Sequence, residues 1–232
     1  MQTRKLFALL WRINAIVILF VGLIAGVVLG LVGYMLFKEA TQTRHVDNVA
    51  NTILGDVRES AAELGSFNPI PGSSVLRAPL IVHQTYSIGA GSKEAGSTRN
   101  YLYFDPTTRS AYWLRPTMDR VILSDTMLPD REYHEKNASA VAYVYVSVEK
   151  DTNNDDRLTE SDEKQIAISS PNGKSYRVVV PKADSLNEAA LISPTRLLIL
   201  YSKGAKLAAV EVDPSDFASS ITEYEIPVTL KR

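Results

Sequence analysis

The twelve residues DTNNDDRLTESD, at positions 151–162, carry oxygen-bearing groups at a spacing that suits a bound metal ion. Calcium takes about six to eight hard oxygen ligands from carboxylates, side-chain amides and backbone carbonyls. Positions 1, 3, 5, 7, 9 and 12 of the stretch supply the candidate ligands: Asp151, Asn153, Asp155, Arg157 through its carbonyl, Thr159 and Asp162. The spacing therefore predicts a Ca²⁺ site whose role is structural.

The same stretch resembles the calcium loops of the EF-hand and dockerin families, in the dockerin form with Asn153 at position 3 and Asp162 at position 12. The resemblance covers these twelve residues and implies a bound calcium ion. Position 6 is Asp156 where the families have glycine, and strand-like runs flank the loop instead of helices. A loop between strands would brace a connection and not open a helix pair as a sensor does. The alternative is a solvated acidic loop without a metal.

The remaining chemistry-bearing residues form no recognisable catalytic set. The chain has no cysteine, and His45, His83 and His134 are not spaced as metal-ligating pairs. The segment at 89–98 resembles a phosphate-binding loop, but Ser97 stands where that loop needs lysine. We therefore expect a protein that is not an enzyme. A membrane-tethered hydrolase stays as a third interpretation, because catalytic triads need no sequence neighbourhood.

An apolar segment at residues 13–37 predicts a retained transmembrane helix. Three cations precede it without an acid, whereas the charges just after it nearly cancel, so the N-terminal tail at 1–12 is expected in the cytoplasm. The C-terminal domain is then periplasmic or otherwise extracytoplasmic, and the location is the inner (cytoplasmic) membrane. The net charge is −1 for the whole chain. This charge shows no excess of basic residues, so nucleic acid is not an expected partner.

Small residues inside this segment predict a helix-packing face. Gly22, Gly26 and Gly30 are four positions apart, and Gly33 lies close to the same face. Such spacing lets two membrane helices approach closely. The expected partner is another membrane protein or a second copy of this chain. The alternative is that glycine is simply common in membrane helices.

The segments after the anchor are expected to change from helix to strand. An amphipathic pattern predicts a helical stalk at 38–65, and a turn-rich linker follows at 66–74. From 75 to 232, short runs rich in Val, Ile, Tyr and Leu predict an antiparallel, mainly-β exported domain. The aromatic group of Tyr101, Tyr103, Tyr112 and Trp113 is expected to be the packed face of a sheet, with a ligand surface as the alternative.

Three strand–turn–strand–turn–strand units between about 98 and 228 resemble the blade-like meanders of β-propellers. Three units are fewer than a closed propeller requires. We therefore expect an open twisted sheet or a sandwich, with a partial propeller as the alternative.

These observations together predict a single-pass membrane protein whose exported β domain binds another protein. It would be a non-catalytic accessory, scaffold or assembly subunit of a membrane complex. The alternative is a membrane-anchored sensor or receptor-like protein that recognises a small ligand outside the cytoplasm.

Overall fold

The computed structural model describes the backbone of residues 2–41, 50–51, 58–59, 62–88, 91–129 and 138–229. The chain divides into two compact units. The first contains Met1–Arg44 with Ser87–Ser92, and the second contains His45–Tyr86 with Lys93–Arg232. The second unit is the β domain.

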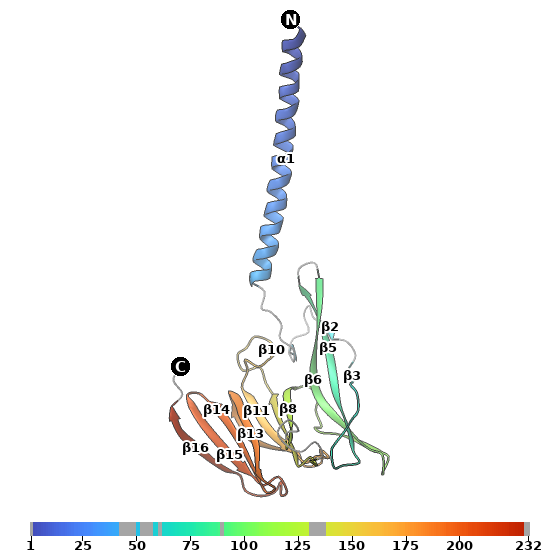
Figure 1. The fold of residues 1–232 in the computed structure, drawn as a ribbon, viewed down its shortest axis with the longest axis vertical. Helices are drawn as coiled ribbons and strands as arrows, with labels where there is room; N and C mark the ends of the chain where they lie inside the picture. The colour runs from blue at the N-terminus through green and yellow to red at the C-terminus, as the bar shows by residue number, and fades with distance from the viewer. Residues whose placement is uncertain are drawn as a thin grey trace. The chain divides into compact units, whose positions relative to one another are not determined.

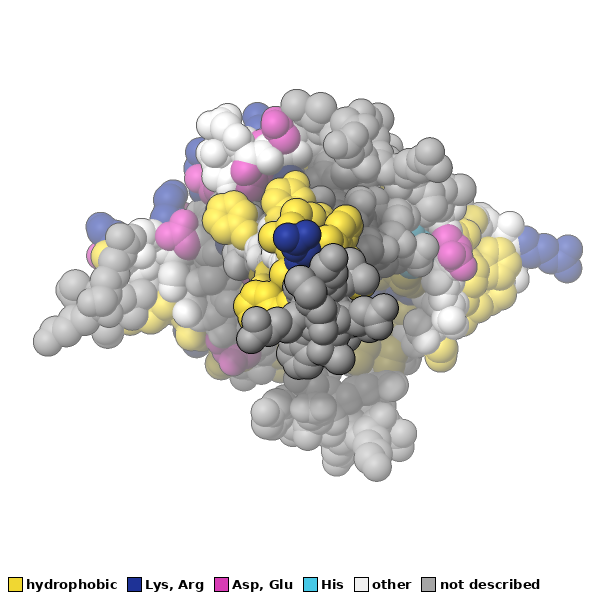
Figure 2. All heavy atoms as spheres, turned by 90° about the horizontal axis from the view of Figure 1, so that it is seen from above, with side chains coloured by type: hydrophobic (Ala, Val, Ile, Leu, Met, Phe, Trp, Pro, Cys, Tyr) yellow, Lys and Arg dark blue, Asp and Glu magenta, His cyan; other side chains and the backbone are white. Residues whose placement is uncertain are grey.

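The N-terminal unit is built on one α-helix, α1 (Gln2–Thr41). Its segment Trp11–Phe37 has 27 residues and a mean hydropathy of 3.0, so it is long and apolar enough to cross a membrane. It contains no proline, and its described side chains are exposed. Figure 2, which looks along the molecule from above, shows hydrophobic side chains gathered there. A single N-terminal apolar helix is thus confirmed.

A large antiparallel sheet forms one layer of the β domain (Figure 1). Its main path runs β12-β11-β9-β8-β6-β5-β2, while β3 and β4 pair with β5 and β7 pairs with β6. The strands are β2 (Arg58–Glu59), β3 (Glu63–Leu64), β4 (Asn68–Pro69), β5 (Leu76–Ile88), β6 (Gly91–Asp105), β7 (Ser110–Trp113), β8 (Val121–Leu128), β9 (Ala142–Val148), β11 (Lys164–Ser169) and β12 (Arg177–Ala183).

A smaller antiparallel meander of four strands, in the order β13-β14-β15-β16, forms the second layer. Its strands are β13 (Ser185–Ser193), β14 (Arg196–Lys203), β15 (Lys206–Val212) and β16 (Thr222–Thr229). Asp184 alone separates β12 from β13, so the chain passes from one sheet to the other within one residue. A third, two-stranded sheet pairs β1 (Ala50–Asn51) with β10 (Arg157–Leu158).

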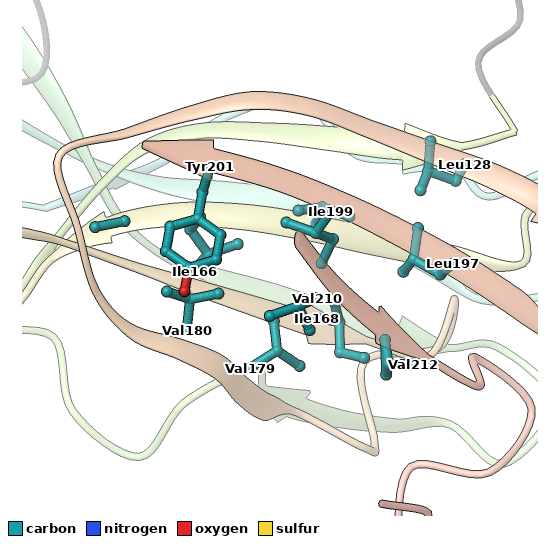
Figure 3. Packing of buried hydrophobic residues seen from close by; sticks show 12 residues of the cluster. Leu128, Ile166, Ile168, Val179, Val180, Leu197, Ile199, Tyr201, Val210 and Val212 are labelled. Carbon is teal, nitrogen blue, oxygen red and sulfur yellow. The ribbon is translucent and has the colours of Figure 1, made fainter. Parts of the chain in front are cut away.

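The large sheet and the four-stranded sheet pack face to face through a common hydrophobic core (Figure 3). Alternate residues of β14 point into this core, because successive side chains of a strand face opposite sides. These are Leu197, Ile199 and Tyr201. The large sheet contributes apolar side chains from β8, β9, β11 and β12: Leu128, Val144, Ile166, Ile168, Val179, Val180 and Ala183. This packing makes the second unit a β-sandwich over these strands.

A second core, rich in tyrosine, lies on the other face of β9. Val144 belongs to the inter-sheet core, whereas its neighbours Tyr143 and Tyr145 belong to the second cluster. Tyr101 and Tyr103 of β6 join that cluster and are buried, as expected for a packed sheet face. Strand β9 is consequently buried along its whole length.

The expected β-rich, antiparallel domain is confirmed, and its meanders form a sandwich without propeller closure in the described strands. The helical stalk at 38–65 is wrong at the described residues beyond Thr41. Ala50–Asn51, Arg58–Glu59 and Glu63–Leu64 are extended and pair with other strands. Their backbone groups find partners on β5 and β10, which local helical periodicity does not reveal. The stretch expected as a linker, 66–74, contains β4 and the buried Ile70.

The inter-sheet core provides a direct test of this architecture. We expect Ile199→Ala to lower the free energy of unfolding by about 2–5 kcal/mol, because it leaves a cavity in a site with 0% exposure. Ile192→Ala removes the same atoms from a position that is 54% exposed, and its effect should stay within about 0.5 kcal/mol. Urea unfolding of the full-length protein in detergent measures both. Equal losses would contradict the packing described.

Candidate functional site

The acidic loop at 151–162 is folded around the carboxylate of its first residue. Asp151 accepts hydrogen bonds from the backbone amides of Asn154, Asp155 and Asp156 at 2.7, 3.3 and 2.8 Å. Asp155 in turn accepts from the amide of Arg157 at 3.0 Å. Asn154 and Asp156 have φ angles of 59° and 62°, in the left-handed region. Asp156 therefore makes the turn that calcium loops usually assign to glycine at position 6.

The last residue of the loop closes it. Asp162 is only 2% exposed. Its Oδ1 accepts from the amide and the hydroxyl of Thr152, and its Oδ2 accepts from the amide of Thr159. Both oxygens are thus used to join the two ends of the loop.

The structure brings the six predicted ligands onto one compact loop but does not gather their carboxylates at one point. Among the described residues, no group of three or more His, Cys, Asp or Glu side chains is placed to hold a metal ion. The agreement with a calcium loop lies in the oxygen-rich donor set and in the backbone path. The calcium site stays a prediction.

A buried charge network fixes the start of the loop to the large sheet. Arg115 is 4% exposed, and its Nη1 donates to Oε1 of Glu149 at 3.0 Å. Glu149 also accepts from Arg120 and from the hydroxyl of Ser147. Because Glu149 stands two positions before Asp151, this carboxylate sets where the loop leaves β9.

Two further contacts hold the second half of the loop. Leu158 is buried in a small cluster with Val121 and Val148. The short strand β10, which contains Leu158, also pairs antiparallel with β1, with Ala50 opposite Leu158 and Asn51 opposite Arg157. The loop therefore contacts both the large sheet, through Leu158, and strand β1, which follows the N-terminal helix in sequence.

A second charged residue is buried in the tyrosine core. The guanidinium carbon of Arg77 lies 3.4 Å from the ring centre of Tyr101 and 4.2 Å from that of Tyr143. Its Nη1 donates to Oδ2 of Asp125 at 2.7 Å, and Tyr101 donates to Oδ1 of the same carboxylate at 2.5 Å. Its Nε and Nη2 have no hydrogen-bond partner among the described residues, and the tyrosine rings attract the cation instead.

The surroundings keep these tyrosines neutral. Burial, and then the charge of Asp125, raise the pKa of Tyr101 well above its ordinary value. Burial likewise raises the pKa of Tyr145, whose hydroxyl lies 3.0 Å from both the Tyr103 and the Ser169 hydroxyls. Burial thus favours the neutral form of both hydroxyls.

The other residues noted in the sequence are dispersed. His83 is half-buried and its Nε2 lies 3.9 Å from a carboxylate oxygen of Glu63, while His45 and His134 lie outside the residues whose side chains are described. Gly22, Gly26, Gly30 and Gly33 lie on α1, where a Cβ at any of the four positions would meet no described atom within 4 Å. These positions leave space for a neighbouring helix. Their role in helix packing stays a prediction.

Comparisons with protein-family models, with curated proteins and with solved structures found no match to this chain. The candidate function therefore depends on the chain's own residues.

The ion pair between Glu149 and Arg115 should be essential for the stability of the β domain. We expect Glu149→Gln to lower the free energy of unfolding by roughly 3–5 kcal/mol, because it leaves the Arg115 guanidinium buried without a counter-charge. Glu225→Gln breaks the exposed pair with Lys206 and should cost about 1 kcal/mol or less. Urea denaturation compares the two variants. A loss at Glu149 no larger than that at Glu225 would show that Arg115 finds another partner.

Proposed function

We propose that this chain is a single-pass membrane protein and a non-catalytic accessory, scaffold or assembly subunit of a membrane complex. Its single apolar helix is the anchor, and its β domain lies outside the cytoplasm. The observation that carries the proposal is the helix itself: in Trp11–Phe37 the large apolar side chains are exposed. Exposed apolar surface of this extent requires lipid or protein around it.

The charge distribution supports the orientation. Arg4, Lys5 and Arg12 precede the apolar span without an accompanying acid. Cations adjoining a span favour its cytoplasmic side, so the β domain is exported to the periplasm or an equivalent compartment.

The helix face that carries the glycines of α1 is the surface that contacts the partner. Gly22, Gly26 and Gly30 recur every four residues, and an added Cβ at these positions would be free of intramolecular contacts in the described chain. Backbones can therefore approach closely along this face and gain the van der Waals contact that drives membrane helix association. The partner is another membrane protein or a second copy of this chain.

Substitution at the centre of this face tests the joint. We expect Gly26→Ile to release the partner when the full-length protein is purified in mild detergent, because the added side chain separates the helix backbones. Val28→Ile enlarges a side chain on the opposite face and should keep the partner, since residues two apart differ by roughly 200°. Quantitative mass spectrometry of the co-purified proteins measures both. Unchanged recovery with Gly26→Ile would exclude this face as the joint.

We further propose that the loop at 151–162 binds Ca²⁺ with a structural role. The donors are the oxygens of Asp151, Asn153 and Asp155, followed by those of Arg157 (its carbonyl), Thr159 and Asp162. The ion would neutralise a loop that carries five acids, and the left-handed turn at Asp156 and the oxygen-only donor set are compatible with it. No helix pair flanks the loop, so the ion would brace the connection between β9 and β11.

Thermal unfolding tests the calcium proposal. We expect calcium to raise the Tm of the parent protein and to leave the Tm of the Asp151→Ala/Asp155→Ala double variant unchanged, because an ion that binds only the folded state stabilises it. Asp216→Ala removes an acid outside the loop and should retain the full calcium effect. Identical melting of the parent protein with calcium and with chelator would end the proposal.

A membrane-anchored sensor is the second candidate, and one surface feature favours it. A shallow pocket of about 200 Å³ at one end of the small sheet is lined by polar and charged side chains, among them Arg196, Glu211 and Asp213. Arg196 and the hydroxyl of Tyr224 hold the pKa of Glu211 down to about 2, so this acid stays charged. The volume is below the roughly 300–1,000 Å³ typical of ligand sites, so the subunit function is preferred.

A further inference from the structure

The outward face of the four-stranded sheet is apolar. Side chains such as Ile199 and Val210 point into the inter-sheet core (Figure 3), so their neighbours along each strand point away from it. Residues directly opposite each other on paired strands share a face. The register therefore places on the outward face Ala190 of β13, Leu198 and Leu200 of β14, Leu207 and Ala209 of β15, and Tyr224 and Ile226 of β16.

This outward face lies outside the described core. Its three leucines and Ile226 are half-buried, and Tyr224 is 41% exposed. None of its residues belongs to a hydrophobic cluster of the described part of the chain. Contiguous apolar surface of this kind marks an interaction site, whereas apolar residues scattered singly over a surface do not.

The charges on this face favour a partner with little net charge. Arg196 and Glu211 lie at one end of the face and neutralise each other, because Nε and Nη2 of Arg196 donate to the carboxylate at 2.7 and 2.8 Å. Tyr224 donates its hydroxyl to the same carboxylate. Glu188 adds one exposed acid on β13, at the edge of the sheet. Such a face attracts no strongly charged partner and barely repels a second copy of itself.

The relief of the face also fits a second copy. Ala209 lies between Leu200 on β14 and Tyr224 on β16, so a small side chain separates two large ones. A two-fold axis that runs along the strands would place β14 of each copy over β15 of the other. Each Leu200 would then lie over the Ala209 of the other copy, in the hollow that this small side chain leaves. A surface that fits itself about a two-fold axis is what a symmetric dimer requires.

The free edge of the same sheet is a poorer contact between copies. Among the described strands, β16 has a neighbour on one side only, and its Pro227 lacks the backbone donor that a further strand would need. Antiparallel pairing of two copies about Tyr224 would place Glu223 opposite Glu225. Like charges directly opposite each other destabilise a strand pair. The face is therefore the better surface for a second copy.

The size of the face indicates a weak contact. Four strands spaced about 4.8 Å apart, each over about six residues of roughly 3.4 Å, give a flat area of about 400 Å² per copy. Two copies would bury roughly 800 Å² of this area, whereas stable interfaces bury about 1,200–2,000 Å². Anchoring both copies in one membrane raises their effective concentration and offsets the difference.

We propose that the outward face of the four-stranded sheet is the surface through which two anchored copies of this chain associate. The inference deepens the proposed function, because it names a second copy as the partner of the β domain. It rests on the proposed membrane anchor but not on the proposed calcium site. The two domains together would form four layers, with the two four-stranded sheets in the middle.

Chemical cross-linking tests this contact. The chain has no cysteine of its own, so single cysteines can be introduced without a background. In full-length protein in lipid vesicles, a short bismaleimide should convert Leu200→Cys to a covalent dimer at least about tenfold faster than Thr107→Cys, because only position 200 lies between the copies. Thr107 is exposed in the turn between β6 and β7 of the large sheet. Both rates are normalised to labelling by a monofunctional maleimide, and equal rates would overturn the proposal.

A charge on the face provides a second test. With Tyr224→Cys as the reporter, adding Leu200→Arg should lower the cross-linking at least about fivefold, because it brings two like charges together in an apolar contact. Thr107→Arg adds the same charge on the large sheet and should leave the cross-linking unchanged. Equal cross-linking with and without Leu200→Arg would contradict the proposed contact. Flotation of the same vesicles reports the anchor separately: protein lost from the floated vesicles refutes the anchor, whereas floated protein without the cross-link refutes the contact alone.

Discussion

The Glu149 carboxylate compensates a guanidinium that is almost completely buried, and the end of the domain that carries the acidic loop is organised around this pair. Arg115 would be costly in this position without the counter-charge, because water cannot reach it. The same carboxylate receives Arg120 and Ser147, and it stands at the point where β9 ends. One buried ion pair thereby fixes the position from which residues 151–162 begin, and with it the strand on which β1 docks.

The burial of the Arg77 guanidinium is compensated in a different way. Only one of its nitrogens has a described hydrogen-bond partner, on Asp125, and the faces of Tyr101 and Tyr143 surround the rest of the guanidinium. A planar, delocalised cation can be buried in this way, whereas a lysine ammonium could not stack on the rings. The tyrosine core is therefore held by a cation as well as by apolar contact.

The sequence predicted the elements whose signal is local. The unbroken apolar run predicted the helix, and the short runs rich in Val, Ile, Tyr and Leu predicted the strands. It failed at Ala50–Asn51, Arg58–Glu59 and Glu63–Leu64. The three-to-four spacing of apolar residues there is typical of a helix, but these described residues pair with β10 and β5. Arg77 and Arg115 could have been noticed as charged residues within strand-like apolar runs, yet their partners lie 48 and 34 positions away. Such long-range pairing has no local signature.

The route by which the chain enters the β domain has a mechanical consequence. After β1, the strands β2, β3 and β4 meet β5 in succession, opposite Thr85, Ile81 and Arg77. A pull on the N-terminal end of the β domain would load these short pairs one after another, because they follow one another along the chain. Strands β2, β3 and β4 would therefore separate from β5 one at a time, and the force would reach the hydrophobic core only after these pairs have opened.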